Sequence, residues 1–360
     1  MTESLTRLAH ATTAQTDNIP VANSRADLIA RDGEAIRSFV LSTAKNGHVT
    51  QCIAVANLIG VEIEDVVQEP GVNKALPDWR RELEKTRWIL PALRMAWRVR
   101  KGRFIILASG RSVLPACRLI KQLRGDNVFI LFIGSPKKWT TRCTDVMLRS
   151  KHEREEDRDE ENRYPWNPKQ IWVDAPICRP LPVSASKDMG VAVLLGGLNI
   201  TYGDEVADYS AFLEHLDTLV QSYSVSIIFS RRTKPEVEQA FRQRFAKTSA
   251  NLVDAANRQG FLDACAGAGA FVVTPDSITM VAEACATGKP VYTAKLPAKR
   301  EGTRNHRFIE TTLEKGYAQP FDGEINFERR TVDRDDIEAA RRDITNYIDA
   351  WKRDPSTLSS

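Results

Sequence analysis

Short apolar runs alternate with segments of helical periodicity along most of the chain. The first half has apolar runs at residues 36–41, 61–67, 104–108, 128–133, 144–148 and 170–173. The second half continues the pattern with runs at residues 191–195, 226–229, 271–274 and 290–293. Runs of this length, rich in Val, Ile, Leu and Phe, are typical of strands that are buried in a parallel sheet. The alternation therefore predicts an α/β protein built from βαβ units.

Helices are expected between most of these runs. Gly60 can end a helix over residues 51–58, because glycine commonly follows the last helical residue. Asp204 can act as the N-cap of a helix that continues to Gln221. The remaining helical segments are expected to run to Leu123, to Phe245 and over residues 278–286.

The strands and helices fall into two series that meet near residues 180–187. We expect a mobile polar tail over residues 1–35, a first Rossmann-like domain over 36–182, a second over 183–330, and a C-terminal helix and tail over 331–360. The predicted fold class is α/β, with two Rossmann-like domains that face each other across a cleft. Ligands of such sheets bind at the carboxyl ends of the strands, in the loops that lead into the helices.

The most informative of these loops joins the run at 271–274 to the helix at 278–286. Asp276 and Ser277 stand where the first turn of the helix leaves backbone N–H groups unpaired, at the positive end of the helix dipole. A diphosphate can bind there, with the hydroxyls of Ser277 and Thr279 as further donors. Glu283, about two turns along, can accept hydrogen bonds from a ribose. A simple helix cap with an exposed glutamate explains the same residues equally well.

Two neighbouring loops of the second domain could complete this site. Gly196 and Gly197 allow close approach of the backbone to a ligand, because glycine lacks a Cβ atom, although a plain tight turn is an equal alternative. Ser230 precedes Arg231 and Arg232, whose guanidinium groups can neutralise phosphate. Ordinary surface charge is the alternative for the arginines.

Two loops of the first domain could form the acceptor side. They contain Gly47, His48, Gln51, Ser109, Gly110 and Arg111. A histidine in a loop that faces the cleft is suited to general-base catalysis near neutral pH. Arg111 can bind an anionic acceptor. A loop histidine and an ordinary helix cap are the alternatives.

Composition excludes several classes of protein. The 51 basic and 47 acidic residues give a net charge of +4, too small to indicate a nucleic-acid-binding protein. The six cysteines form no CxxC pair, so we expect reduced, buried thiols and no metal site. No apolar stretch reaches the ~18 residues of a transmembrane helix, and residues 1–35 lack the apolar segment of a secretory signal. These features favour a cytoplasmic location.

Two charged segments stand apart. The segment from Trp79 to Arg103 contains nine Lys or Arg residues, two Glu residues and three Trp residues, and Pro91 should interrupt its helix. Basic residues beside tryptophan suit an anionic membrane surface, and a packed helix with a solvated basic face is the alternative. The segment from Lys151 to Arg163, with seven acidic and four basic residues, is expected to be a solvated surface loop.

Several motifs resemble the mitochondrial fission "elongated mitochondria" family, whose bacterial members are often labelled nucleoside-diphosphate-sugar epimerases. They lie between residues 36 and 323 and comprise Gly47-His48-x-x-Gln51, Ala108-Ser109-Gly110-Arg111-Ser112, Leu195-Gly196-Gly197, Phe229-Ser230-Arg231-Arg232-Thr233, Val273-Thr274-Pro275-Asp276-Ser277-Ile278-Thr279-Met280-Val281-Ala282-Glu283-Ala284 and Thr287-Gly288-Lys289-Pro290-Val291-Tyr292. The resemblance implies a glycosyltransferase-B-like architecture. It also implies that the second domain holds a nucleotide sugar, that Glu283 binds its ribose, and that His48 matches the loop histidine of the acceptor domain.

Three functions are compatible with these residues. The leading hypothesis is an inverting glycosyltransferase that moves a sugar from a nucleoside diphosphate to a cell-envelope lipid or saccharide, with His48 as general base and no metal or further cofactor. The second is a non-catalytic scaffold at a membrane surface, which recruits a dynamin-like partner as plant members of the family are thought to do. This surface would be the inner membrane of a bacterium or the mitochondrial surface of a eukaryote. A sugar-nucleotide epimerase ranks third, because the first domain offers few carboxylates near strand ends. The pattern specifies no oligomeric state.

Overall fold

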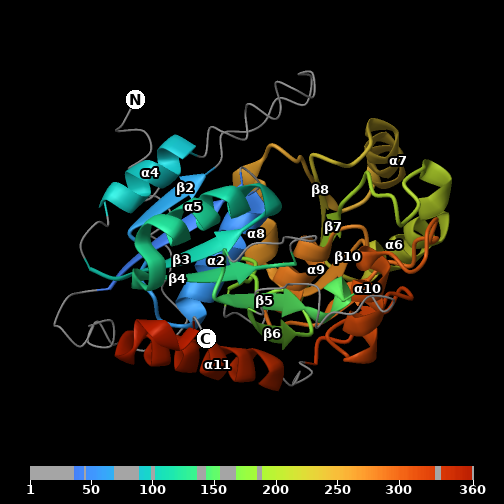
Figure 1. Ribbon diagram of the computed structural model, residues 1–360. Coiled ribbons are helices and arrows are strands. Elements are labelled where there is room, and N and C mark those ends of the chain that lie inside the picture. Colours follow the sequence, from blue (N-terminus) through green and yellow to red (C-terminus); the bar gives the residue numbers. More distant parts are fainter. Residues whose placement is uncertain are drawn as a thin grey trace.

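The computed structural model describes residues 36–43, 46–68, 89–98, 102–135, 143–154, 168–184, 189–328 and 334–358. These residues form two α/β units, each built around a six-stranded parallel sheet (Figure 1). The two units follow each other along the chain, so the predicted fold class is confirmed. The remaining residues, including the predicted tail at 1–35, lie outside the described part of the chain.

The first sheet has the strand order β2-β1-β3-β4-β5-β6. Its strands are β1 (Arg37–Ser42), β2 (Asp65–Gln68), β3 (Phe104–Ser109), β4 (Val128–Ile133), β5 (Val146–Ser150) and β6 (Lys169–Val173). The helical segments of this unit are α2 (Asn46–Leu58), α4 (Ile89–Arg98), η2 (Arg111–Val113), α5 (Leu114–Arg124), η3 (Gly125–Asn127) and η4 (Lys151–Glu153). Helix α2 packs on one face of the sheet, and α4 and α5 pack on the other.

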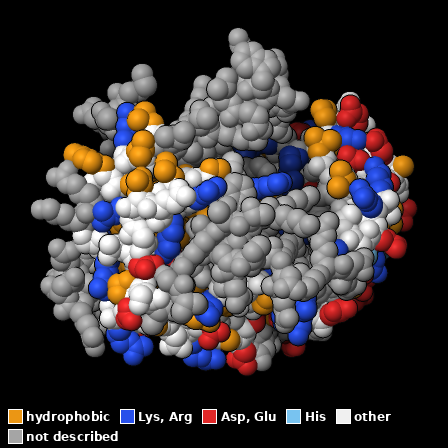
Figure 2. Space-filling view, in the orientation of Figure 1, with side chains coloured by type: hydrophobic (Ala, Val, Ile, Leu, Met, Phe, Trp, Pro, Cys, Tyr) orange, Lys and Arg blue, Asp and Glu red, His pale blue; other side chains and the backbone are white. Residues whose placement is uncertain are grey.

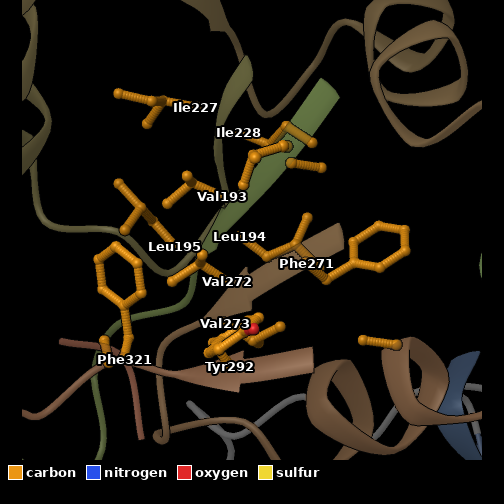
Figure 3. Close-up of a cluster of buried hydrophobic side chains, with 14 of the residues drawn as sticks. Val193, Leu194, Leu195, Ile227, Ile228, Phe271, Val272, Val273, Tyr292 and Phe321 are labelled. Atoms are coloured by element: carbon orange, nitrogen blue, oxygen red, sulfur yellow. The ribbon is translucent and has the colours of Figure 1, made fainter. Parts of the chain in front are cut away.

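The second sheet has the order β12-β11-β10-β7-β8-β9. Its strands are β7 (Gly190–Leu195), β8 (Val225–Phe229), β9 (Asn251–Val253), β10 (Ala268–Val273), β11 (Val291–Thr293) and β12 (Gln319–Pro320). The helical segments are η5 (Val206–Tyr209), α6 (Ser210–Ser222), α7 (Pro235–Phe245), α8 (Arg258–Ala266), α9 (Ile278–Cys285) and α10 (Arg304–Glu314). Figure 3 shows part of the core, where apolar side chains of β7, β8 and β10 gather near Tyr292 and Phe321.

The last long helix, α11 (Asp335–Arg353), returns to the first unit, and η6 (Pro355–Leu358) follows it (Figure 1). Ile344, Ile348 and Trp351 of α11 are buried in the core that α2 shares with the first sheet. The Trp351 ring lies 5.7 Å from that of Phe129, and its indole N–H donates to the carbonyl of Asp126 at 2.7 Å. The chain therefore passes between the two units twice.

Both sheets reverse their strand order next to their first strand. In the first sheet β2 and β3 lie on opposite sides of β1, and in the second sheet β8 and β10 lie on opposite sides of β7. The carboxyl ends of the two strands at such a reversal diverge into helices on opposite faces, which leaves a crevice that can bind a ligand. The loops after β1, β3, β7 and β10 are those in which the sequence places most of its candidate residues.

The two units contact each other through η4 and α10. The guanidinium of Arg307 donates to the carbonyl of His152 at 3.1 Å, Arg304 pairs with Glu153, and the His152 ring packs edge-on against Phe308 at 5.1 Å. His152 and Glu153 are buried. The prediction of a solvated loop from Lys151 to Arg163 is therefore wrong at its start, because this part forms a domain contact; residues 155–167 are not described.

Two local predictions were also wrong. Helix α2 begins at Asn46, five residues earlier than expected, so Gly47 and His48 lie in its first turn. Asp204 does not cap a helix: its carboxylate pairs with Lys234 and Lys299. Glu205 and Asp208 instead form a capping box before η5. Pro91 lies in the first turn of α4, where a missing N–H removes no helical hydrogen bond. The predicted segment before Ile89 lies outside the described residues, so the interruption of a longer helix at Pro91 stays a prediction.

Candidate functional site

The loops after β7 and β10 are joined by hydrogen bonds at the reversal point of the second sheet. The N–H of Gly196 donates to the Thr274 hydroxyl at 2.8 Å, and the N–H of Gly197 donates to Asp276 Oδ2 at 2.7 Å. The side-chain amide of Asn199 donates to the carbonyl of Asp276 at 2.5 Å. These bonds fix the two predicted loops against each other before any ligand is present.

Close packing explains why this loop begins with two glycines. A Cβ atom on Gly196 would lie 2.5 Å from the carboxyl carbon of Asp276, far inside van der Waals contact. Gly197 has φ 141°, a conformation that favours glycine, and a Cβ atom there would overlap the carbonyl of Arg232. Leu198 follows with φ 41°, which is strained for a branched side chain. The bonds to Asp276 on either side hold this strained residue in place.

Asp276 is a brace inside the loop pair. Its side chain is only 4% exposed, and Oδ1 is buried without a hydrogen-bond partner in the part of the chain that the structure describes. Burial raises the pKa of this carboxyl above its ordinary value, and hydrogen bonds from Thr274 and Gly197 oppose that shift. The sequence analysis offered ligand binding and helix capping as alternative roles for Asp276. In the structure the carboxylate of Asp276 instead holds the loop after β7 against the loop after β10.

The first turn of α9 is open. Ser277 is the N-cap, but its buried hydroxyl makes no capping hydrogen bond. The first helical amides, those of Ile278, Thr279 and Met280, have no backbone or side-chain acceptor among the described residues. Thr279 and Met280 are partly exposed, and the first turn contains no acidic residue. The positive end of the helix is therefore available to an anion.

The start of α2, in the first unit, faces the start of α9. A Cβ atom on Gly47 would lie 3.8 Å from Thr279 Oγ1, which is ordinary contact distance across the space between the units. The first turn of α2 likewise has no acidic residue. Two positive helix ends thus meet at the reversal points of both sheets, an arrangement that favours a ligand with more than one negative charge.

Glu283 lies one and a half turns along α9, on the side of the chain crossing at residues 178–181. Its carbonyl accepts the N–H of Leu181 at 3.3 Å. Its carboxylate is largely buried and has no hydrogen-bond or ion-pair partner among the described residues. Burial raises the pKa of this carboxyl from 4.5 to about 7. Gln51 of α2 approaches the same crossing, where its side chain is close enough to the Cys178 thiol to lower the pKa of that thiol against the larger effect of burial.

The loop after β8 contributes positive charge at its surface. Arg231 and Arg232 are exposed, and Arg232 is close enough to Asp276 to lower the pKa of that carboxyl. The Ser230 hydroxyl donates to the carbonyl of Gly196 at 3.0 Å and accepts the N–H of Arg232 at 3.1 Å, so Ser230 braces the loop. Figure 2 shows Lys and Arg side chains in the hollow between the two halves of the molecule.

The acceptor-side residues divide into two groups. His48 lies beside Gly110, and its Nδ1 is 2.7 Å from the hydroxyl of Thr43 at the end of β1. Ser109, in contrast, is buried and donates to the carbonyl of Ile133 at 3.1 Å, so it holds β3 against β4. Arg111 is exposed at the start of η2. The sequence analysis missed Thr43. The feature that could have pointed to it is its hydroxyl-bearing side chain directly after a buried strand.

The structure therefore brings together residues of five predicted loops. One group consists of Gly196, Gly197, Ser230 and Asp276; a second consists of Thr43, His48 and Gly110; and Gly47 joins the two units through Thr279. Among the described residues, no group of three or more His, Cys, Asp or Glu side chains could hold a metal ion. Within the same residues, no helix combines the length and apolarity that a membrane span requires.

Comparison with known proteins identifies relatives of this chain in sequence. The family model described as "Mitochondrial fission ELM1" matches residues 46–344. The mitochondrial fission protein ELM1 of Arabidopsis thaliana is 24% identical over 258 residues, which cover 62% of this chain and 58% of that protein. An uncharacterized protein of Rickettsia prowazekii, RP120, is 28% identical over 140 residues, which cover 37% of this chain and 39% of that protein. The chain therefore matches less than two thirds of either relative's length.

Among solved structures, the trehalose-6-phosphate synthase OtsA superposes with a TM-score of 0.50 and 11% identity, covering 88% of this chain and 97% of that one. This likeness concerns the fold alone. It agrees with the two-domain glycosyltransferase-B-like arrangement that the strand order and the facing loops establish.

Proposed function

The chain belongs to the mitochondrial fission ELM1 family, and we propose that it binds a nucleoside-diphosphate sugar between its two units and transfers the sugar to an acceptor. One observation supports this above all others: the starts of α2 and α9 meet at the reversal points of the two sheets, with Gly47 and Thr279 in contact distance. Two acid-free helix starts suit the two phosphates of a nucleotide sugar.

The surrounding residues supply the rest of such a site. Glu283 has no partner for its carboxylate among the described residues, and this carboxylate would bind the two hydroxyls of a ribose. The exposed Arg231 and Arg232 would offset charge on the diphosphate. Asp276, Thr274 and the two glycines hold the loops in place, so little reorganisation is needed when the ligand binds.

The proposed reaction is a single displacement at the anomeric carbon. His48 takes the proton of an acceptor hydroxyl, the acceptor oxygen bonds to the anomeric carbon, and the bond to the diphosphate breaks with its electron pair on the leaving oxygen. The helix starts and the arginines stabilise the charge that develops on that oxygen. This path inverts the configuration of the sugar. A cell-envelope lipid or saccharide is the acceptor we propose.

Calorimetric titration of the full chain with UDP-, GDP-, ADP- and CMP-linked sugars tests the proposal. At least one should bind, and Glu283→Gln or the double change Arg231→Gln/Arg232→Gln should weaken it about tenfold or more, since charge-assisted hydrogen bonds contribute about 1.5–3 kcal/mol. Arg341→Gln, on the exposed face of α11, is the control and should bind normally. A sample that neither binds nor hydrolyses any of these sugars contradicts the proposal.

A second candidate function, docking on an anionic membrane, has a specific observation in its favour. Leu90, Leu93 and Trp97 lie at helical spacing on α4 and are 54%, 42% and 67% exposed. Neither α4 nor α5 contains an acidic residue, whereas Arg94 and Arg118 lie on their exposed faces. Figure 2 shows hydrophobic side chains over these helices. Trp79 and Trp88 of the predicted basic segment lie outside the described residues.

Sedimentation with lipid vesicles separates this candidate from the first. Vesicles with about one third phosphatidylglycerol should retain the protein, and pure phosphatidylcholine vesicles should not. Trp97→Glu should abolish retention without changing nucleotide-sugar binding. Met189→Glu, an exposed apolar residue of the second unit, is the control. Equal binding by Trp97→Glu and the unchanged protein excludes docking through α4.

A further inference from the structure

Two asparagines hold the two peptide carbonyls that come just before Ser277, the N-cap of α9. The side-chain amide of Asn199, in the loop after β7, donates to the carbonyl of Asp276 at 2.5 Å. The side-chain amide of Asn305, in the first turn of α10, donates to the carbonyl of Pro275 at 3.2 Å. Two segments that are far apart in the chain therefore hold successive peptides of the loop that leads into α9.

The two asparagines belong to one hydrogen-bonded frame. Asn199 Oδ1 accepts the N–H of Thr201 at 2.6 Å, which keeps the amide nitrogen of the same side chain directed at Asp276. The hydroxyls of Thr201 and Thr303 are hydrogen-bonded at 2.8 Å, and Thr303 is the N-cap of the helix that contains Asn305. Thr201 and Asn305 are buried. The frame is thus in place without a ligand.

Peptide geometry links these carbonyls to the amides that follow them. A trans peptide is planar, and its C=O and N–H groups point in opposite directions. The hydrogen bond from Asn199 to the carbonyl of Asp276 therefore directs the N–H of Ser277 away from Asn199. If this peptide rotated by half a turn, a carbonyl oxygen would replace the N–H group, and a carbonyl can only accept hydrogen bonds. Such a peptide could not bind an anion.

The polar groups of Ser277 lack partners. Ser277 is only 7% exposed, and neither its N–H nor its hydroxyl has a hydrogen-bond partner among the described residues. Polar groups of a buried residue that lack partners cost free energy in the folded state. An anion at the start of α9 would satisfy these groups together with the open amides of the first helical turn.

We propose that Asn199 and Asn305 are positioning residues of the candidate anion site. They hold the carbonyls of Asp276 and Pro275, and so keep the N–H of Ser277 available as a further donor to a phosphate group. Each asparagine acts through the peptide that it holds and not through its own contact with the ligand. That the anion is the diphosphate of a nucleotide sugar rests on the proposed function.

Carbonyl ¹³C NMR of the full chain tests the two hydrogen bonds without a ligand. Asn199→Leu, which has a similar size and no donor, should move the Asp276 signal to higher field, because the carbonyl loses its hydrogen bond. Asn305→Leu should do the same to the Pro275 signal. Asn251→Leu is the matched control, since that exposed side chain bonds to the neighbouring strand β8, and both signals should stay. An Asp276 signal that also stays in Asn199→Leu overturns the proposal.

Calorimetric titration with UDP and with inorganic pyrophosphate tests the consequence for binding. Asn199→Leu should weaken both ligands about tenfold or more, the effect of losing one charge-assisted hydrogen bond, and Asn251→Leu should bind normally. In NMR titrations the Ser277 amide proton should shift to lower field in the unchanged protein and stay in place in Asn199→Leu. A general loss of stability would not produce this difference.

Two results separate this inference from the proposed function. Equal affinities of Asn199→Leu and the unchanged protein, or a Ser277 amide that neither ligand shifts, overturn the positioning role and leave the proposed function standing. If the unchanged protein binds neither ligand, the proposed function itself fails, whereas the carbonyl spectra still decide how the two peptides are held.

Discussion

Glu283 should make the protein less stable at alkaline pH than it would be with a neutral side chain. The carboxyl is largely buried and no described residue supplies a hydrogen bond or a positive charge to it, so burial raises its pKa from 4.5 to about 7. A buried carboxylate without a compensating partner lowers the stability of the folded state. Residues that bind ligands often carry such a cost. Glu283→Gln removes the charge and keeps the size and shape of the side chain.

The direction and size of the effect follow from linkage. The folded state holds the proton of Glu283 more tightly than the unfolded state does, so its contribution to stability falls as pH rises from 4.5 through 7. Each pH unit between the two pKa values corresponds to about 1.4 kcal/mol, which gives about 3 kcal/mol above pH 7.5. Glu283→Gln should therefore match the unchanged protein at pH 4 and exceed its free energy of unfolding by about 3 kcal/mol at pH 8.

Urea denaturation at pH 4, 6 and 8 measures this difference. Glu236→Gln, an exposed residue of α7, is the matched control and should differ from the unchanged protein by less than about 0.5 kcal/mol at each pH. A difference for Glu283→Gln that does not grow with pH would refute the reasoning. So would a variant that is more stable and still binds nucleotide sugars with unchanged affinity, because the carboxylate would then serve no ligand.

Three further predictions concern the scaffold, and each is checked by urea denaturation. Gly196→Ala should lower the free energy of unfolding by about 1–3 kcal/mol and abolish nucleotide-sugar binding, because the new Cβ atom overlaps Asp276. Gly267→Ala is the control: its Cβ atom has room, so neither stability nor binding should change. Equal effects of the two variants would contradict this prediction. Lys121→Met should lower the free energy of unfolding by about 3–5 kcal/mol, because the buried Asp145 carboxylate loses its ion pair with the lysine, 2.7 Å away. Adding Asp145→Asn should recover at least half of the loss. Burial and two neighbouring arginines lower the pKa of His152 from 6.5 to about 3, so the free energy of unfolding should fall by about 2 kcal/mol as pH drops from 7.5 to 5. His152→Leu should remove this pH dependence. An unchanged pH dependence in His152→Leu would count against a buried neutral ring.

Most of the sheet could be predicted from sequence, because strands that are buried on both faces appear as continuous apolar runs. Residues 128–133 were predicted with the bounds that β4 has, and the prediction for β3 is one residue short. β9 and α8 were missed, since a strand of three residues and a weakly amphipathic helix leave little periodicity. The order of the strands in the sheet cannot be predicted from apolar runs. No feature of the sequence near β3 indicates that this strand pairs with β1 and not with β2.

The sequence predicted where the candidate residues lie in the fold better than it predicted their contacts. It placed them in strand-to-helix turns, where the structure also has them, because such turns follow the apolar runs that form the strands. It could not show that Asp276 braces Gly197, since the two residues are 79 positions apart and their hydrogen bond depends on the pairing of β7 with β10. For the same reason the sequence could not show that His152 and Glu153, in an acidic segment, are buried in the contact with α10.

The convergence of two helix starts on one diphosphate is tested most directly by amide NMR of the full chain during titration with UDP, and with inorganic pyrophosphate in parallel. The account predicts saturable shifts at Thr279 and Met280 in α9 and at Gly47 and His48 in α2, with the same midpoint at both helices. Binding that leaves either helix start unchanged, or no binding of either anion, would contradict it.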